Sequence, residues 1–205
     1  MLLWKNTAGI RMATEIELKA WVSNPEELGR KLSGLAVFIG NFEKSDAYFQ
    51  PVNSAETPER PGYGVRLRKE KTKNLNGVLK ELNYVTYKSK QVRDGIEVND
   101  EREFEVSSAS AFEEFLEYIG YRESIKKHKT GNSYKNDSMT VELTEVQGLG
   151  WFIELEILAA EQDDENTEAI KKRLLSFLDQ LEIPRKSIES RSYAEMLKNP
   201  RATGE

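Results

Sequence analysis

Polar and apolar residues alternate along much of this chain, and the first clear case covers residues 15–19. In an extended strand, Glu15, Glu17 and Lys19 would lie on one face, with Ile16 and Leu18 on the other. The alternation returns about seven more times, and residues 152–157 almost repeat it. The pattern therefore predicts about eight strands, each with a charged face and an apolar face.

Apolar residues at helical spacing predict four helices between these strands. The first begins at Pro25, after a cap at Asn24, and ends at Gly34, and the second runs from a cap at Ser110 to Gly120. Two more are predicted at residues 165–181 and 190–198. Gly148 and Gly150 predict the turn of a hairpin, and the polar segment 51–61, bounded by prolines, is a candidate mobile lid.

The charged strand faces have two possible environments. Antiparallel sheets commonly expose one face to water, so the periodicity alone favours solvent. Eight strands are also enough to close a barrel with the charges inside. Each unpaired buried ion costs roughly several kcal/mol, so such a lumen would hold water, ions and a ligand. The inward-facing set would be Glu15, Glu17, Lys19, Arg66, Arg68, Lys88, Lys90, Glu103, Glu105, Lys127, Lys129, Glu142, Glu154 and Glu156.

Length and charge narrow the class of protein. With 205 residues, we expect a single domain over residues 13–198 and an N-terminal extension over residues 1–12. Met12 is a candidate start, so we expect residues 1–11 to be dispensable. The net charge of -5 argues against nonspecific binding of a nucleic acid polymer. No apolar run is long enough to span a membrane, so we expect a cytoplasmic protein without a membrane partner.

The residue types restrict the chemistry. The chain has no cysteine and one histidine, His128, which excludes thiolate and multi-histidine zinc sites. We expect His128, between two lysines, to be a surface or packed residue. Two Glu-x-Glu pairs offer hard oxygen ligands for Mg²⁺ or Mn²⁺, and the many Lys and Arg residues suit a dense polyanion. Together they indicate a site for a metal-bound triphosphate and in-line phosphoryl or nucleotidyl transfer.

The motif at residues 15–19 resembles the ExExK signature of the CYTH superfamily, the triphosphate tunnel metalloenzymes. That superfamily includes class IV adenylyl cyclases and thiamine triphosphatases. The resemblance continues in order through residues 46–49, 65–68, 86–88, 102–105, 148–156 and 192–197. It implies an α+β fold, an eight-stranded antiparallel β-barrel with the charges inside and helices packed outside.

The resemblance also implies roles for individual residues. Candidate metal ligands for Mg²⁺ or Mn²⁺ are Glu15, Glu17, Glu103, Glu105, Glu154 and Glu156, and candidate substrate-binding residues are Lys19, Arg66, Arg68, Lys88, Lys90, Lys127 and Lys129. Of these, Lys19, Arg66 and Lys127 are the candidate catalytic residues. A homodimer would also fit the resemblance, and rests on it alone.

Two enzymatic reactions fit this resemblance. The first is an adenylyl cyclase that converts ATP to cyclic AMP and pyrophosphate, which residues 148–157 and 192–197 favour. The alternative is a triphosphatase that hydrolyses inorganic triphosphate, thiamine triphosphate or a nucleoside triphosphate. Lys129 stands where similar sequences often have arginine, and Thr144 stands where an aspartate is expected, which bears on the cyclase reaction. A non-enzymatic polyphosphate- or nucleotide-binding module is less favoured, because anion capture does not need so many acids.

Overall fold

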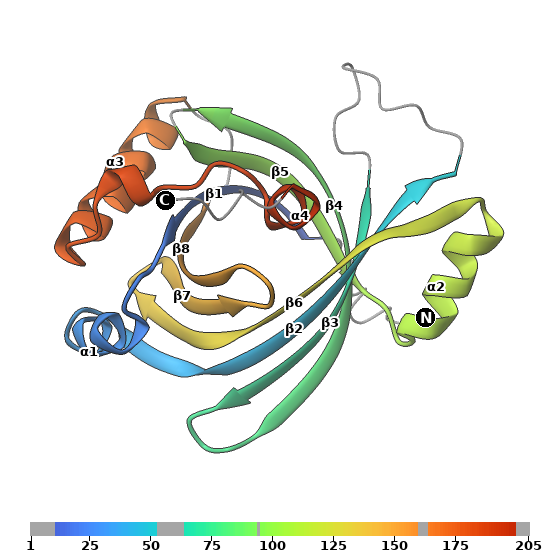
Figure 1. Ribbon diagram of the computed structural model, residues 1–205, viewed down its shortest axis with the longest axis horizontal. Coiled ribbons are helices and arrows are strands. Elements are labelled where there is room, and N and C mark those ends of the chain that lie inside the picture. Colours follow the sequence, from blue (N-terminus) through green and yellow to red (C-terminus); the bar gives the residue numbers. More distant parts are fainter. Residues whose placement is uncertain (1–10, 53–63, 94, 160–163, 200–205) are drawn as a thin grey trace, which may run out of the picture.

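The computed structural model describes residues 11–52, 64–93, 95–159 and 164–199, with the backbone alone for residues 11–13, 88–91, 93, 100, 101, 164 and 165. Eight antiparallel strands form a closed barrel in the order β1-β5-β4-β3-β2-β6-β7-β8 (Figure 1). The strands are β1 (Arg11–Trp21), β2 (Val37–Pro51), β3 (Val65–Asn74), β4 (Leu79–Arg93), β5 (Ile96–Glu105), β6 (Tyr121–Asn136), β7 (Met139–Val146) and β8 (Gly150–Ala159). The predicted fold class is confirmed.

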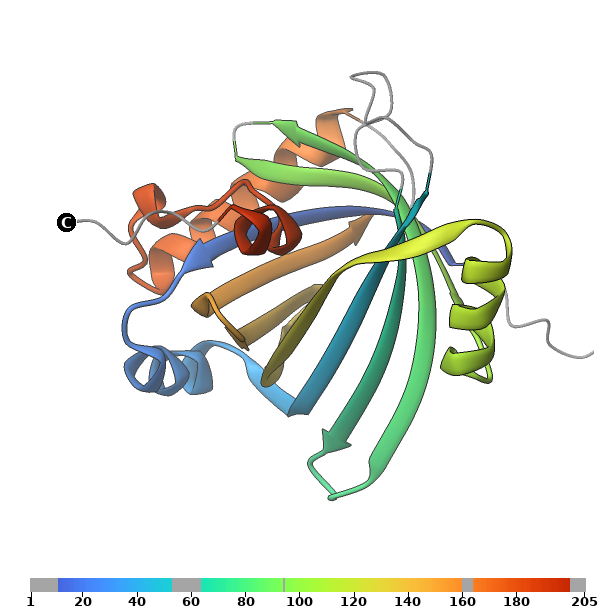
Figure 2. The same cartoon turned by 45° about the vertical axis from the view of Figure 1, so that its right-hand side comes forward.

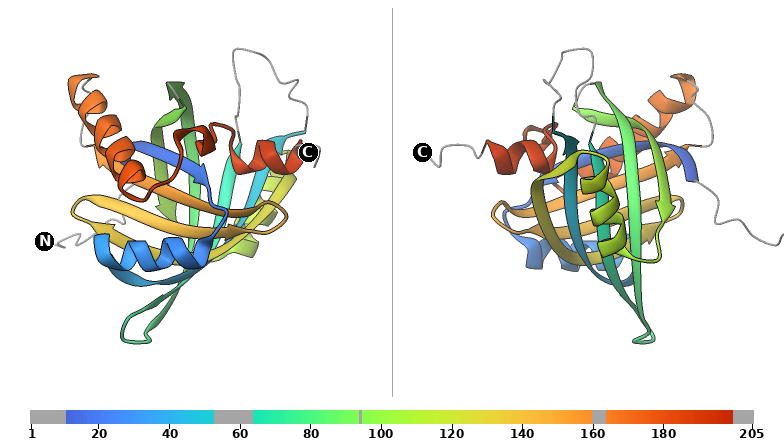
Figure 3. Two further views of the ribbon diagram at one scale, coloured as in Figure 1. Left: turned by 60° about the vertical axis from the view of Figure 1, so that its left-hand side comes forward. Right: turned by 90° about the vertical axis from the view of Figure 1, so that its right-hand side faces the viewer.

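Helices pack on the outside of the barrel wall. They are α1 (Pro25–Leu35), α2 (Ala109–Tyr118), α3 (Asp164–Gln180) and α4 (Tyr193–Lys198), with a short 3-10 turn at Arg185–Ser187. The helices α1 and α3 lie on one side of the molecule and α2 lies on the other, while the β3–β4 hairpin projects beyond the wall (Figure 2). The short helix α4 lies at one opening of the barrel (Figure 3).

The hydrophobic cores lie between the helices and the outer face of the wall. The larger core joins Ile16 and Leu18 of β1 to Leu32 of α1 and Leu174 of α3. A second core packs α2 against β2, β3 and β4. Because the helices cover the apolar strand faces from outside, the charged faces point into the lumen. Solvent exposure of the charged faces, which periodicity alone favoured, is therefore wrong for these strands.

The helix boundaries follow local capping chemistry. Asn24 caps α1 as predicted, since its side chain accepts a hydrogen bond from the backbone N–H of Glu27. The cap of α2 is Ser108 and not Ser110, because the Ser108 hydroxyl reaches the backbone N–H of Ala111 at 3.2 Å and Ser110 lies within the first turn.

The last helix starts later than the sequence suggested. The helix α4 begins at Tyr193, because Ser192 and Glu195 form a reciprocal capping box there. The residues before it follow β1 instead, through a bridge between Ala20 and Ile188. The hairpin turn at Gly148 is confirmed, with β7 and β8 on either side. Residues 53–61 of the candidate lid lie outside the described residues.

Candidate active site

Strand register gathers acidic residues on one side of the lumen. Residues directly opposite each other in an antiparallel pair point to the same face. Glu17 therefore lies beside Glu156 across β1 and β8, and Glu142 lies beside Glu154 across β7 and β8. Lys19 also faces Glu154 across the β1–β8 pair. Three neighbouring strands thus supply four carboxylates to one surface of the lumen.

The opposite wall carries most of the described cations. Asp46 of β2 lies between Arg68 of β3 and Lys127 of β6, with Arg68 nitrogens at 2.7 and 3.0 Å from its carboxylate oxygens and the Lys127 Nζ at 2.8 Å. Burial alone would raise the pKa of Asp46, but the charges of Arg68 and Lys127 outweigh it and hold that pKa well below its usual range. Asp46 is therefore ionised and fixes two cations of the lumen.

A second cluster centres on Lys129 and joins β6 to the acidic strands. The Lys129 Nζ lies 2.6 Å from Glu154 and 3.2 Å from Glu142, and Lys44 lies 2.5 Å from Glu142. Burial opposes the charge on each group. The nearby carboxylates nevertheless raise the pKa of Lys129, while Lys129 and other nearby cations lower the pKa of Glu154. The buried charges are stable because they are paired.

Two further ion pairs continue this network along the wall. Lys19 contacts Glu97 at 3.3 Å, and both are almost fully buried. Arg66 donates a hydrogen bond to the Thr86 hydroxyl at 2.8 Å and lies 3.5 Å from Glu103. Among the described residues, the lumen is thus lined by ionic side chains of both signs from seven strands and by the Thr86 hydroxyl of β4.

Tyr193 reaches this network from α4. Its hydroxyl donates a hydrogen bond to Glu154, and its ring lies near three lumen lysines. Burial and then the Glu154 charge raise the pKa of Tyr193 well above its usual value, so the phenol stays protonated. The helix α4 thus adds a neutral hydrogen-bond donor to the ionic network.

The predicted site residues take several kinds of position. Seven of them belong to the ion-pair network: Lys19, Arg66, Arg68, Glu103, Lys127, Lys129 and Glu154. Three more are half-buried at strand positions that face the lumen: Glu15, Glu17 and Glu156. Glu105 is exposed at the end of β5, outside that network. The side chains of Lys88 and Lys90 in β4 lie outside the described residues.

Sequence reasoning missed several lumen residues. They are Lys44, Asp46, Thr86, Glu97, Asn99 and Tyr193, all of which are buried. Extending the alternation backwards from Lys88 along β4 and from Glu103 along β5 would have found Thr86, Glu97 and Asn99, because these residues occupy every second place. Lys44 and Asp46 also alternate along β2, but no lumen position was predicted in that strand. Tyr193 gave no such signal, because it comes from a helix outside the wall.

Thr144 of β7 places a hydroxyl where the family resemblance implied an aspartate. Thr144 is fully buried, and its Oγ has no hydrogen-bond partner among the described residues. It lies opposite Gly131 of β6 and Phe152 of β8. The neighbouring acids are Glu142, which points into the lumen, and Glu145, which is exposed.

The lumen's chemistry fits a hard divalent cation. Two pairs of facing glutamates supply oxygen donors, which suit Mg²⁺ or Mn²⁺ and would otherwise repel each other. Among the described residues, however, no three Asp, Glu or His side chains are already arranged around one metal position. Glu142 and Glu154 instead hold lysines. A cation would therefore have to compete with ammonium groups for these carboxylates.

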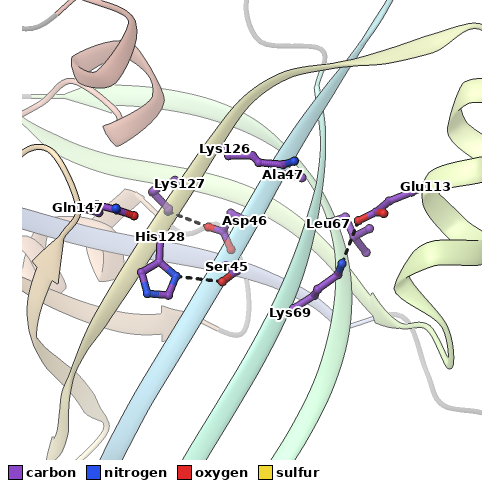
Figure 4. Close-up of a pocket in the computed structure, with 10 residues that line it drawn as sticks. All are labelled: Ser45, Asp46, Ala47, Leu67, Lys69, Glu113, Lys126, Lys127, His128 and Gln147. Atoms are coloured by element: carbon purple, nitrogen blue, oxygen red, sulfur yellow. Dashed lines mark hydrogen bonds and ion pairs between the residues drawn. The ribbon is translucent and has the colours of Figure 1, made fainter.

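A groove of about 550 Å³ lies along strands β2, β3 and β6 and is lined by both wall and surface residues (Figure 4). His128 is half-buried there, with its Nδ1 3.0 Å from the Ser45 hydroxyl. Lys69 in the same groove pairs with Glu113 of α2 at 3.2 Å. His128 thus lies one residue from two lumen lysines but alternates to the other face of β6.

Among the helices that the structure describes, none is long and apolar enough to cross a bilayer.

A closed antiparallel barrel with an ionic lumen and external apolar cores defines the class of triphosphate tunnel proteins. Comparison with known families agrees: a model of the CYTH domain matches residues 13–193, and the chain belongs to the CYTH family. A Methanocaldococcus jannaschii protein provisionally named an adenylate cyclase is 24% identical over 185 residues, covering 89% of this chain and 97% of that protein.

Solved structures show the same fold. The PH1819 protein of Pyrococcus horikoshii superposes with a TM-score of 0.78 at 26% identity, covering 91% of this chain and 99% of that one. The Hippeastrum protein HpAC1, described as having a dominant triphosphatase activity, superposes with a TM-score of 0.60 at 17% identity, covering 91% and 95% of the two chains. At that identity the likeness to HpAC1 concerns the fold alone.

Proposed function

We propose that this protein is a metal-dependent enzyme that acts on a triphosphorylated substrate inside its barrel, as an adenylyl cyclase. The observation that carries the proposal is the convergence of Lys19, Arg66, Arg68, Lys127 and Lys129 on one lumen that also holds facing glutamates. A dense polyanion with a bound cation satisfies both sets of charges at once. The full-length similarity to a protein provisionally named an adenylate cyclase supports the choice of reaction.

In this proposal the chain's own residues bind and orient the substrate. Lys127, Lys129 and Arg68 hold phosphate oxygens, while Lys19 and Arg66 neutralise charge that develops as the bond to the leaving group breaks. Glu15, Glu17, Glu154 and Glu156 would hold Mg²⁺ or Mn²⁺, and the cation would neutralise charge on the phosphate oxygens. The 3'-oxygen of ATP then bonds to the α-phosphorus, pyrophosphate leaves and the hydroxyl proton passes to solvent.

Triphosphate hydrolysis is the second candidate, and Thr144 favours it. A cyclase must orient a ribose hydroxyl, and at this wall position the chain offers a buried hydroxyl where a carboxylate was expected. Hydrolysis needs only a water molecule at the terminal phosphorus. The same cations would serve either reaction.

Product analysis distinguishes these reactions. Purified protein is incubated with Mg²⁺ or Mn²⁺ and, separately, with ATP, inorganic triphosphate and thiamine triphosphate. We expect equimolar cyclic AMP and pyrophosphate from ATP, and a metal chelator should stop the reaction. Orthophosphate without cyclic nucleotide would identify a triphosphatase. Binding of these compounds without turnover would overturn both enzymatic candidates in favour of a binding module.

Replacing Glu156 by alanine tests the acidic wall. We expect turnover to fall by at least about 100-fold with folding retained, because removing one of two facing glutamates relieves repulsion with Glu17 while deleting an oxygen donor. Glu145→Ala, which removes an exposed carboxylate from the neighbouring β7, is the matched control and should keep normal turnover. Normal turnover in Glu156→Ala would contradict the assignment of this wall to metal binding.

A further inference from the structure

Tyr193 is the one described residue outside the eight strands whose side chain both hydrogen-bonds a lumen carboxylate and lies near several lumen lysines. Its ring packs nearly edge-on against Phe152, with centroids 4.9 Å apart, and its hydroxyl donates to Glu154. The residue is 6% exposed. A helix outside the barrel therefore places a phenol at the junction of the acidic and basic walls.

Three ammonium groups surround the Tyr193 ring. The Nζ atoms of Lys19, Lys127 and Lys129 lie 5.0, 5.1 and 5.9 Å from its centroid. Like charges gathered this closely repel each other. An aromatic ring offsets part of that repulsion, because the negative face of its quadrupole attracts each cation, more strongly when water is excluded.

The attachment of α4 to β1 links Tyr193 to one of these lysines. The backbone N–H of Glu189 donates to the carbonyl of Lys19 at 2.8 Å, and the Glu189 carboxylate accepts a hydrogen bond from the Trp21 indole at 3.2 Å. The capping box then starts α4 with Tyr193 as its first residue. The chain thus fixes the ring and the Lys19 backbone relative to each other.

A purely structural role would require only apolar packing. Met196 of the same helix provides it, since this apolar side chain is 1% exposed within the small core of Val146, Phe152, Tyr193 and Met196. Tyr193 differs in having both its polar atom and its ring face engaged with charged residues. Those partners are the residues proposed above to bind phosphate and a cation.

We propose that Tyr193 is a positioning residue of the triphosphate site: its ring keeps the Lys19, Lys127 and Lys129 ammonium groups together for a polyphosphate, and its hydroxyl orients Glu154. This inference rests on the proposed function. The two parts of the side chain have separable effects. Loss of the ring lets the lysines move toward their carboxylates and weakens anion binding, whereas loss of the hydroxyl alone leaves Glu154 misdirected.

Two substitutions separate these effects, and a third is their control. Tyr193→Phe keeps the ring, Tyr193→Leu removes ring and hydroxyl, and Met196→Ala removes packing from the same helix. Binding of inorganic triphosphate is measured by calorimetry with a metal chelator present, kcat and KM are measured with metal, and folding is checked by thermal unfolding.

We expect Tyr193→Leu to bind inorganic triphosphate about tenfold more weakly and to raise KM. Tyr193→Phe should bind it within about twofold of the unsubstituted protein but lose about tenfold in kcat. Met196→Ala should unfold at a lower temperature and bind normally. If Tyr193→Leu binds triphosphate as tightly as the unsubstituted protein, or if Met196→Ala loses as much affinity as Tyr193→Leu, the role of Tyr193 is overturned while the proposed function stands. Failure of the unsubstituted protein to bind triphosphate would overturn the proposed function as well.

Discussion

At the scale of single residues, the lumen depends on charges that are buried but paired. Asp46 shows the principle, since it is 2% exposed and contacts both Arg68 and Lys127. Buried ion pairs add little net stability relative to apolar residues, yet removing one partner is costly because the other charge remains buried. These pairs therefore fix the positions of the lumen cations while adding little to the net stability of the barrel.

Replacing Asp46 by asparagine should destabilise the protein by about 3 to 5 kcal/mol, because two buried cations lose their counter-ion. Inorganic triphosphate should restore more stability to Asp46→Asn than to the unsubstituted protein, because it supplies negative charge to the same cations. Urea unfolding with and without triphosphate measures both effects. The control is Asp137→Asn at an exposed ion pair with Arg173, which should change stability by less than about 1 kcal/mol. Equal losses at the two positions would contradict this account.

Close backbone approach at Gly131 sets a second requirement at this scale. A Cβ there would lie 2.3 Å from the Leu143 carbonyl and 2.8 Å from the Phe42 ring, and the carbonyl belongs to the paired strand β7. Gly131→Ala should therefore destabilise the protein by about 1 to 3 kcal/mol. Gly34→Ala in α1 meets nothing within 4 Å and should stabilise it by up to about 1 kcal/mol. Thermal unfolding of the two variants tests the contrast, and a stabilised Gly131→Ala would refute it.

At the scale of elements, α4 is held in place by polar contacts as much as by apolar ones. Glu189, just before the helix, is 4% exposed and accepts hydrogen bonds from Arg191 and from the Trp21 indole. The hydrogen bonds from Arg191, the largest effect, lower the pKa of Glu189 to about 2 even though burial opposes the charge. The attachment of this helix is therefore expected to depend on pH.

The pKa of Glu189 is depressed in the folded state, so its contribution to stability is present above the unfolded pKa of about 4.3 and is lost as pH falls toward 2. Glu189→Gln should be less stable than the unsubstituted protein at pH 6, by on the order of 1 to 2 kcal/mol. The difference between the two proteins should shrink as pH falls from about 5 to 3. Denaturant unfolding across that range measures it, and a difference independent of pH would show that the carboxylate charge is unimportant.

At the scale of the whole molecule, the chain separates an ionic interior from apolar cores that lie outside the barrel wall. The alternation of charged and apolar residues was enough to predict the strands and their two faces, as in residues 15–19. It could not decide which face is enclosed, because that depends on where the helices pack. Nor could it find the partners of Lys129 or the position of Tyr193, since these depend on strand order and on a distant segment.

An ionic lumen of this kind should respond to a triphosphate and a cation together. We expect triphosphate to draw Lys44 and Lys129 away from Glu142 and Glu154, to which they are paired, and the released carboxylates then to favour Mn²⁺. A ligand at 100 times its Kd stabilises a folded protein by about 2.7 kcal/mol, which corresponds to several degrees in Tm here. We expect inorganic triphosphate to raise Tm far more than sulfate at equal ionic strength, and Mn²⁺ to raise it more with triphosphate present than alone. If sulfate raised Tm as much as triphosphate, the lumen would respond only to ionic strength. If the Tm shift caused by Mn²⁺ were the same with and without triphosphate, the acidic and basic side chains would act independently.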